Sequence, residues 1–135
     1  MSASSAVFEH AEGVHRNGSG PRAGHSWAQG VDRRQQCVVV RVEGELDAAA
    51  SPQFFATIER AVRSNCHAVV IDLRAAKFLS LRTADGLGSV KRRAAGDGTD
   101  VRIVAGRQAI ERSLEVSGVR QLFNHYPSMQ AALDA

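Results

Sequence analysis

The chain has 135 residues, of which 44% are apolar and 5% aromatic, with a net charge of +3. This length fits one domain with a largely aliphatic core, and no apolar run approaches the ~20 residues needed to cross a membrane. The N-terminus lacks the features of a secretory signal, so we expect a cytoplasmic protein without membrane insertion. The cations are spread along the chain rather than gathered in a basic stripe, which argues against nucleic-acid binding.

Two parts of the chain differ in composition. Residues 1–24 are rich in Ser, Gly and Ala and show no hydrophobic period, so we predict a disordered tail. The domain is predicted to occupy residues 25–135. Its two cysteines, Cys37 and Cys66, fit no metal-binding spacing and are interpreted as reduced structural residues, with a redox pair as the alternative. No metal site is predicted.

The first half of the domain predicts two strands and a helix. A weak strand signal covers 25–31, and the β-branched run at 37–42 predicts a strand buried on both faces. Residues 44–47 are predicted to form a turn. Ser51 followed by Pro52 then has the pattern of a helix N-cap and first helical residue, and the apolar stripe predicts that this helix ends near residue 64.

The second half alternates strands and helices. Strands are predicted at 68–73, 101–105 and 122–126, and helices at 81–95, 108–117 and from 127–128 to 133. Such alternation is typical of right-handed crossovers between parallel strands. The sequence therefore predicts an α/β fold, with a mostly parallel sheet of four to five strands and about four helices.

The chain lacks the usual catalytic motifs. It has no P-loop and no nucleophile elbow, and helical periodicity places Gly86 and Gly88 inside a helix rather than in an open phosphate-binding loop. Ser80 follows a strand as a nucleophile would, but no motif places His67 or His125 beside it. We therefore predict that the chain is not an enzyme and uses no cofactor. Glu43, Glu45 and Asp47 are interpreted as solvated turn residues, with Asp47 able to bind backbone amides.

Four stretches together resemble the STAS domain, the family of bacterial anti-sigma factor antagonists and related transporter components. They read VVVRVEGELD, VVIDLRAAKFLS, VRIVA and SGVRQLF, and they begin at residues 38, 69, 101 and 117. The resemblance extends from about Val38 to the C-terminus. It implies the STAS-like fold and a kinase-like anti-sigma factor as the partner.

The resemblance also implies a degenerate phosphorylation switch. In the family, a strand end is followed by Asp-Ser-Ser/Thr-Gly-Leu, and the second hydroxyl residue is phosphorylated. Alignment without a gap puts Ser80 at the aspartate, Leu81 at the first serine and Arg82 at the phosphorylated position. Aligning the Gly-Leu-Gly instead puts Asp85 there. Arginine cannot accept a phosphate, so we expect no phosphorylation at the usual position, although Ser80 or Thr83 could substitute.

The implied function is that of a regulatory protein that binds an anti-sigma factor and controls sigma-factor-dependent transcription. The predicted partner-binding residues are Glu45, Asp47, Ser80, Leu81, Arg82 and Thr83. Leu81 would be an apolar anchor if exposed; alternatively, it packs under the helix start.

Two other functions are compatible with the resemblance. One is an accessory subunit of a lipid-handling ABC transporter. The other is weak nucleotide binding, with Arg74, Lys77 and Arg82 as candidate phosphate ligands near a helix start. Three solvated cations are the simpler interpretation of that group.

Overall fold

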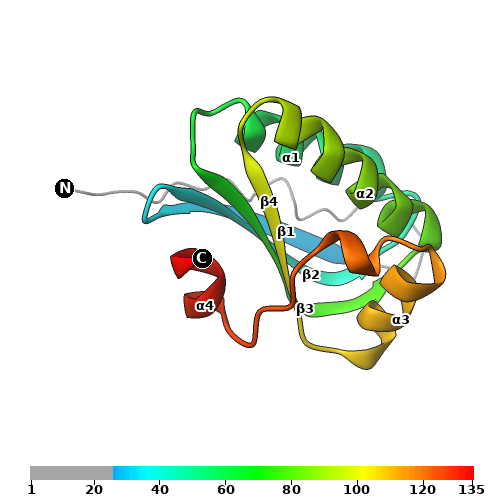
Figure 1. Cartoon of the computed structure of the whole chain (residues 1–135). Coiled ribbons are helices and arrows are strands. Elements are labelled where there is room, and N and C mark those ends of the chain that lie inside the picture. The colour runs from blue at the N-terminus through cyan, green and yellow to red at the C-terminus, as the bar shows by residue number, and fades with distance from the viewer. Residues whose placement is uncertain (1–25) are drawn as a thin grey trace.

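The computed structural model describes residues 26–135, so the predicted tail at 1–24 lies outside the described residues. Four strands and four α-helices follow one another with one short 3-10 helix, η3. In chain order they are β1 (Trp27–Arg34), β2 (Cys37–Leu46), α1 (Ser51–Val62), β3 (Ala68–Leu79), α2 (Leu81–Gly96), β4 (Asp100–Ala105), α3 (Gln108–Val116), η3 (Arg120–Leu122) and α4 (Met129–Asp134). Figure 1 shows α1 and α2 side by side over one face of the sheet, whereas α4 lies on the other.

The sheet has the strand order β1-β2-β3-β4. β1 runs antiparallel to β2, whereas β2, β3 and β4 are mutually parallel. A two-residue turn joins β1 to β2, and Gln35 and Gln36 adopt φ angles of 50° and 68° in it. Positive φ at both positions is the geometry of a type I′ hairpin turn. The predicted α/β fold with a mostly parallel sheet is thus confirmed, with four strands.

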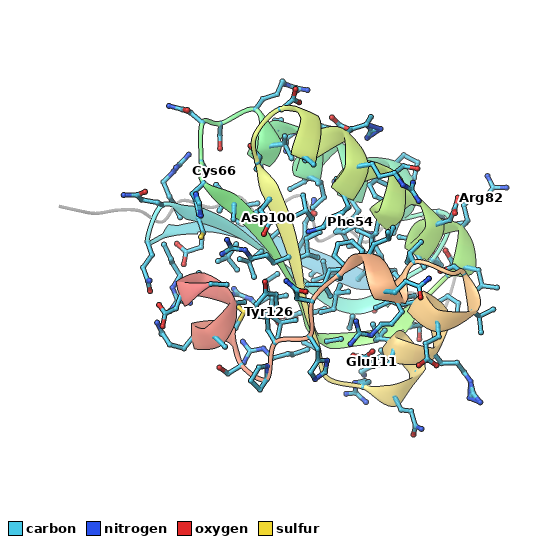
Figure 2. All side chains as sticks on the ribbon, in the orientation of Figure 1. Phe54, Cys66, Arg82, Asp100, Glu111 and Tyr126 are labelled. Carbon is cyan, nitrogen blue, oxygen red and sulfur yellow. The ribbon has the colours of Figure 1, made fainter. Side chains whose placement is uncertain are left out.

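The main core lies between the sheet and the helices α1, α2 and α3. Alternate residues of β2 and β3 point into it, among them Val40 and Ile71, which are fully buried. Phe54 of α1 is the largest fully buried side chain and lies between that helix and the sheet (Figure 2). The β-branched runs that predict these strands therefore supply the center of the fold.

The opposite face is covered by α4, a helix of six residues. Met129, Ala132 and Leu133 pack there on a smaller cluster that includes Val39 and Val70 of the sheet. Because both faces of the sheet are covered, successive residues of β2 and β3 are apolar and point in turn into the two cores.

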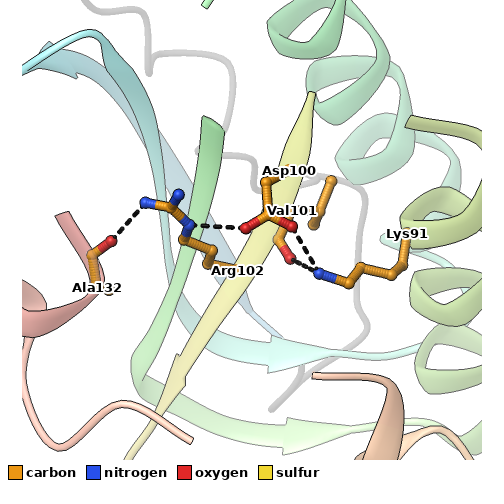
Figure 3. Close-up of polar contacts among 5 residues, drawn as sticks. All are labelled: Lys91, Asp100, Val101, Arg102 and Ala132. Carbon is orange, nitrogen blue, oxygen red and sulfur yellow. Dashed lines mark hydrogen bonds and ion pairs between the residues drawn. The ribbon is translucent and has the colours of Figure 1, made fainter. Parts of the chain in front are cut away.

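A polar network anchors α4 to β4 (Figure 3). The buried Arg102 donates to Asp100 over 2.9 Å and to the carbonyl of Ala132 over 2.8 Å. That carbonyl lies in the last turn of α4, where it has no partner within the helix. Lys91 donates to the other oxygen of Asp100 and to the carbonyl of Val101, both over 2.8 Å. Desolvation would raise the pKa of Asp100, but the hydrogen bonds from Lys91 and Arg102 outweigh it and hold that pKa below its ordinary value.

Several predicted boundaries are wrong. The strand predicted at 122–126 is absent, because the chain turns into η3 and its amides bond locally: those of Leu122 and Phe123 donate to the carbonyls of Val119 and Arg120. The residues predicted as a turn at 44–47 mostly continue β2, which ends at Leu46. β3 likewise does not stop at residue 73, because pairing with β2 carries it on to Leu79.

The start of α1 also differs from the prediction. Ala50 is the N-cap residue, without a side-chain cap, and Ser51 is already helical and buried. The hydroxyl of Ser51 is instead used in a tertiary contact, which a local pattern cannot reveal. At the other end of the domain, the helix predicted from 127–128 begins at Met129, and Ser128 caps it by accepting from the amide of Ala131 over 3.1 Å.

Candidate functional site

The carboxyl ends of β2 and β3 lie together at one edge of the sheet. Glu45 pairs with Phe78 and Leu46 with Leu79, and the amide of Ser80 donates to the carbonyl of Leu46 over 3.1 Å. Two stretches more than 30 positions apart in the sequence are thereby joined. We call the residues Glu45, Asp47, Phe78 and 80–83 the β3–α2 surface.

Gly44 allows β2 to reach this edge. Its φ is +84°, and a Cβ atom there would lie 2.3 Å from the carbonyl oxygen of Ser26. The strand pairing is irregular at this point, with a shift between Gly44 and Glu45. Only glycine fits both the positive φ and the close backbone approach, so Gly44 helps to position Glu45 and Asp47.

Asp47 caps the turn between β2 and α1. Its Oδ1 accepts from the amide of Ala50 over 3.0 Å, so the expectation that it binds a backbone amide is confirmed. Glu45 and Asp47 are both partly exposed. Their carboxylates are held at the edge of the surface by the strand end and the turn.

Three hydroxyl groups connect the starts of α1 and α2. Ser80 is the N-cap residue of α2, and its Oγ accepts from the amide of Thr83 over 3.1 Å. The same Oγ lies 2.8 Å from Oγ1 of Thr83, which lies 3.1 Å from Oγ of Ser51. Thr83 is fully buried and Ser80 partly exposed. Thr83 therefore supports the surface from beneath rather than forming part of its exposed area.

The exposed part of the surface is apolar at its center. Phe78 is 46% exposed and Leu81 51% exposed, on either side of Ser80. Of the two placements considered for Leu81, the exposed one is observed. Arg82 points away from the body of the protein at the start of α2 (Figure 2). Sequence reasoning missed Phe78 as a site residue; its position directly after Lys77 was the available signal.

The two glycines of Gly86-Leu87-Gly88 lie inside α2, as their periodicity predicts. A Cβ at Gly86 would lie 2.7 Å from the ring of Phe55 in α1, and one at Gly88 would lie 2.7 Å from the side chain of Val119. Both glycines thus permit close packing of α2 against its neighbors. This role accounts for them without a phosphate-binding loop.

The cations considered for nucleotide binding are arranged differently from a phosphate site. Arg74 forms a two-pronged ion pair with the buried Asp72, with both contacts at 2.9 Å. Hydrogen bonding to Asp72 raises the pKa of Arg74. Lys77 and Arg82 are exposed. One of the three candidate ligands is therefore already occupied by a carboxylate.

Within residues 26–135, no cluster of three or more His, Cys, Asp or Glu side chains could hold a metal ion. Across the same residues, no helix combines the length and apolar character that crossing a membrane requires. His67 and His125 are both exposed, on different loops, and His125 lies 2.8 Å from Arg120.

Comparisons with known proteins agree with this geometry. The chain is 29% identical to an anti-sigma factor antagonist from Mycobacterium paratuberculosis, with a TM-score of 0.74 over 81% of this chain and 92% of that one. It also resembles the anti-sigma factor antagonist SpoIIAA in its unphosphorylated form, with 21% identity and a TM-score of 0.64 over 79% of this chain and 94% of that one. The Bacillus cell fate determinant SpoIIAA in its phosphorylated form gives 19% identity and a TM-score of 0.58, over 79% of this chain and 97% of that one.

No curated protein sequence matches the chain significantly. The sequence model of the STAS domain, however, matches residues 30–132, well over half of the chain. This match covers all four strands apart from the start of β1, and it includes the β3–α2 surface. The chain therefore belongs to the STAS domain family.

Proposed function

We propose that this protein is an anti-sigma factor antagonist-like regulator, which binds a partner anti-sigma factor through the β3–α2 surface and so controls sigma-factor-dependent transcription. The observation that carries the proposal is the exposure of Phe78 and Leu81 beside the α2 N-cap. Among the described residues only three large apolar side chains are exposed, and two of them lie on this surface. Exposed apolar groups ringed by polar ones mark protein-binding sites.

Similarity to a known antagonist supports the choice of partner. The antagonist from Mycobacterium paratuberculosis shares 29% of its residues with this chain and aligns over 92% of its own length. The proposed function is therefore binding to a protein partner. A partner that docks on it would cover the apolar pair and contact the flanking groups of Glu45, Asp47 and Arg82.

Binding to purified kinase-like anti-sigma factors of the native host, measured by calorimetry, tests this proposal. We expect Leu81→Glu to weaken binding about tenfold or more, because it places a charge at the center of the interface. Val116→Glu is the matched control, since Val116 is the third exposed apolar residue and lies at the end of α3. Loss of binding in the Val116 variant alone, or binding to none of these proteins, would overturn the proposal.

We further propose that the surface is not switched by phosphorylation at the usual family position. Arg82, which occupies that position in the gapless alignment, cannot accept phosphate. Of the two possible substitutes, Thr83 is fully buried, and the Ser80 hydroxyl is engaged with the amide and side chain of Thr83. A phosphate on the buried Thr83 would require the start of α2 to open, and one on Ser80 would crowd the contacts that its hydroxyl makes with Thr83.

The absence of a phosphorylation switch is tested by incubating this protein with the partner kinase, ATP and Mg²⁺. Mass spectrometry of this protein then measures any added phosphate. We expect no stoichiometric phosphate on the wild-type chain. An Arg82→Ser variant restores a hydroxyl at the family position and serves as the positive control, for which we expect phosphorylation. Stoichiometric phosphate on Ser80 or Thr83 would contradict the proposal.

A further inference from the structure

A second candidate binding site lies at the other end of α1. A cleft with a volume of about 230 Å³ separates the edge of β1 from the last turns of α1. Its lining residues are Val31, Asp32, Arg33, Val38, Thr57, Arg60, Ala61 and Ser64. Ser51, at the opposite end of α1, contacts Thr83 of the β3–α2 surface. Ten helical positions, roughly 15 Å, separate Ser51 from Ala61 of the cleft, so the two sites are distinct.

β1 is an edge strand whose outer side is free of backbone partners within residues 26–135. It pairs with β2 alone, and no backbone hydrogen bond from another described segment reaches residues 27–34. An unpaired row of amides and carbonyls is a template for an additional strand. The backbone of β1 therefore offers main-chain hydrogen bonds to an extended segment.

The cleft lies directly along this free edge. Val31, Asp32 and Arg33 are consecutive, and side chains on a strand alternate between the two faces. Because all three line the cleft, the strand edge itself must form part of its wall. A peptide that pairs with β1 would thus run past the cleft and could place one of its side chains in it.

The walls favor an apolar side chain. Val31, Val38 and Ala61 supply the apolar part of the lining, and the hydroxyls of Thr57 and Ser64 supply little polar surface because both are already hydrogen-bonded. One water takes about 30 Å³ in the liquid, so the cleft has the volume of roughly seven waters. That space accommodates a branched or aromatic side chain.

The lining of the cleft carries a net positive charge, because it contains two arginines and one carboxylate, Asp32. Arg33 lies across it, donating to the carbonyl and hydroxyl oxygens of Ser64 over 3.1 Å, and Arg60 lines it from α1. Both arginines are exposed. The nearby Glu59 is already paired with Arg93 over 2.6 Å, so an acidic segment would meet a net positive charge here. A second copy of the chain that paired through its own β1 would bring further arginines to the same edge.

We propose that the β1 edge and the β1–α1 cleft bind an extended acidic segment of a second partner protein by strand addition. In this mode, main-chain hydrogen bonds to β1 provide affinity, an apolar side chain fills the cleft, and carboxylates contact Arg33 and Arg60. This site is additional to the β3–α2 surface, and its occupation leaves that surface free. The protein can thereby connect two partners.

A fluorescent peptide in which glutamate and valine alternate at every second position, with serine between them, places both residue types on one face of the strand. Its binding to the full-length protein, measured by anisotropy, tests the proposal. We expect saturable binding that weakens about tenfold or more in the Arg33→Glu, Arg60→Glu double variant. Arg112→Glu, an exposed change on α3, is the control and is expected to bind normally. A matching lysine and valine peptide should not bind to the wild type.

Methylation of the peptide amides distinguishes strand addition from simple charge attraction. Successive amides of a strand point to opposite edges, so methylating every serine amide and methylating every glutamate and valine amide block different edges. We expect one of these two peptides to lose binding and the other to retain it. Equal binding of both, binding of the lysine peptide, or no saturable binding would overturn the proposal. Sedimentation that shows a wild-type dimer dissociated by the double variant would assign the cleft to self-association and would overturn it as well.

Discussion

The two faces of the sheet are covered in different ways. Three helices bury the first face in one large aliphatic cluster, whereas the second has a six-residue helix and a cluster of eight buried residues. The smaller side compensates with polar contacts, centered on the buried Arg102. Apolar burial grows with area and is insensitive to pH, whereas a charged network depends on each member and on its protonation. The two sides should therefore respond differently to mutation and to acid.

The largest expected effect comes from emptying the main core. Phe54→Ala removes the largest fully buried side chain, and we expect a loss of about 3–5 kcal/mol in the free energy of unfolding. Leu133→Ala on α4 should cost about 2 kcal/mol, the low end for such changes, because the short helix can adjust. Urea unfolding of both variants measures the difference. Equal losses in the free energy of unfolding would show that the two faces of the sheet contribute equally to stability.

Arg102→Met tests the polar anchor of α4. The change keeps an unbranched chain but removes the hydrogen bonds to Asp100 and Ala132, and we expect a loss of about 1–3 kcal/mol. Hydrogen exchange should accelerate in α4 while the amides of α1 remain protected. The comparison fails if exchange accelerates equally in both helices.

The same network should make stability sensitive to acid. Because the pKa of Asp100 is lowered in the folded protein, its ionised form stabilises the fold above the ordinary value of 3.8. That contribution is lost as the pH falls from about this value through the lower folded pKa. Unfolding titrations between pH 7 and pH 2 should show a smaller acid-induced loss for Asp100→Asn than for the wild type. An identical pH profile in the two proteins would rule out this role for Asp100.

The smallest expected effect is a gain in stability from a change in the β1–β2 hairpin. This hairpin contacts α4 through a hydrogen bond of 3.1 Å from Gln35 to Asp134. Gln36 adopts φ 68°, which costs little for glycine and more for other residues. We expect Gln36→Gly to raise stability by about 0.5–1 kcal/mol. Gln121→Gly, at a position without positive φ, should not stabilise the protein. Thermal melts of both variants provide the measurement.

Much of the fold could be predicted because strong local patterns agree with the tertiary structure. The valine runs of β2 and β3 are buried on both faces, and Gly86 and Gly88 follow the helical period of α2. The prediction of a strand at 122–126 was based only on a short apolar run. In the structure, the amides of Leu122 and Phe123 form local hydrogen bonds around η3 instead of pairing with a strand.

The candidate site was predictable in outline. The resemblance to the STAS family selected Glu45, Asp47 and residues 80–83, and strand pairing brings them to one edge. Which side chains are exposed could not be predicted in the same way. Phe78 is exposed and Thr83 buried, although sequence position alone gives no reason to separate them.

The sequence by itself determined the order of the elements from β1 to α3 and the family, because both depend on patterns within short stretches of chain. Only the tertiary structure decided the chain of hydroxyls from Ser51 through Thr83 to Ser80, and the cleft beside β1. Each of these features joins residues more than 30 positions apart, such as Ser51 with Thr83 and Val31 with Ser64. Their contacts depend on how the helices pack on the sheet, which no local period specifies.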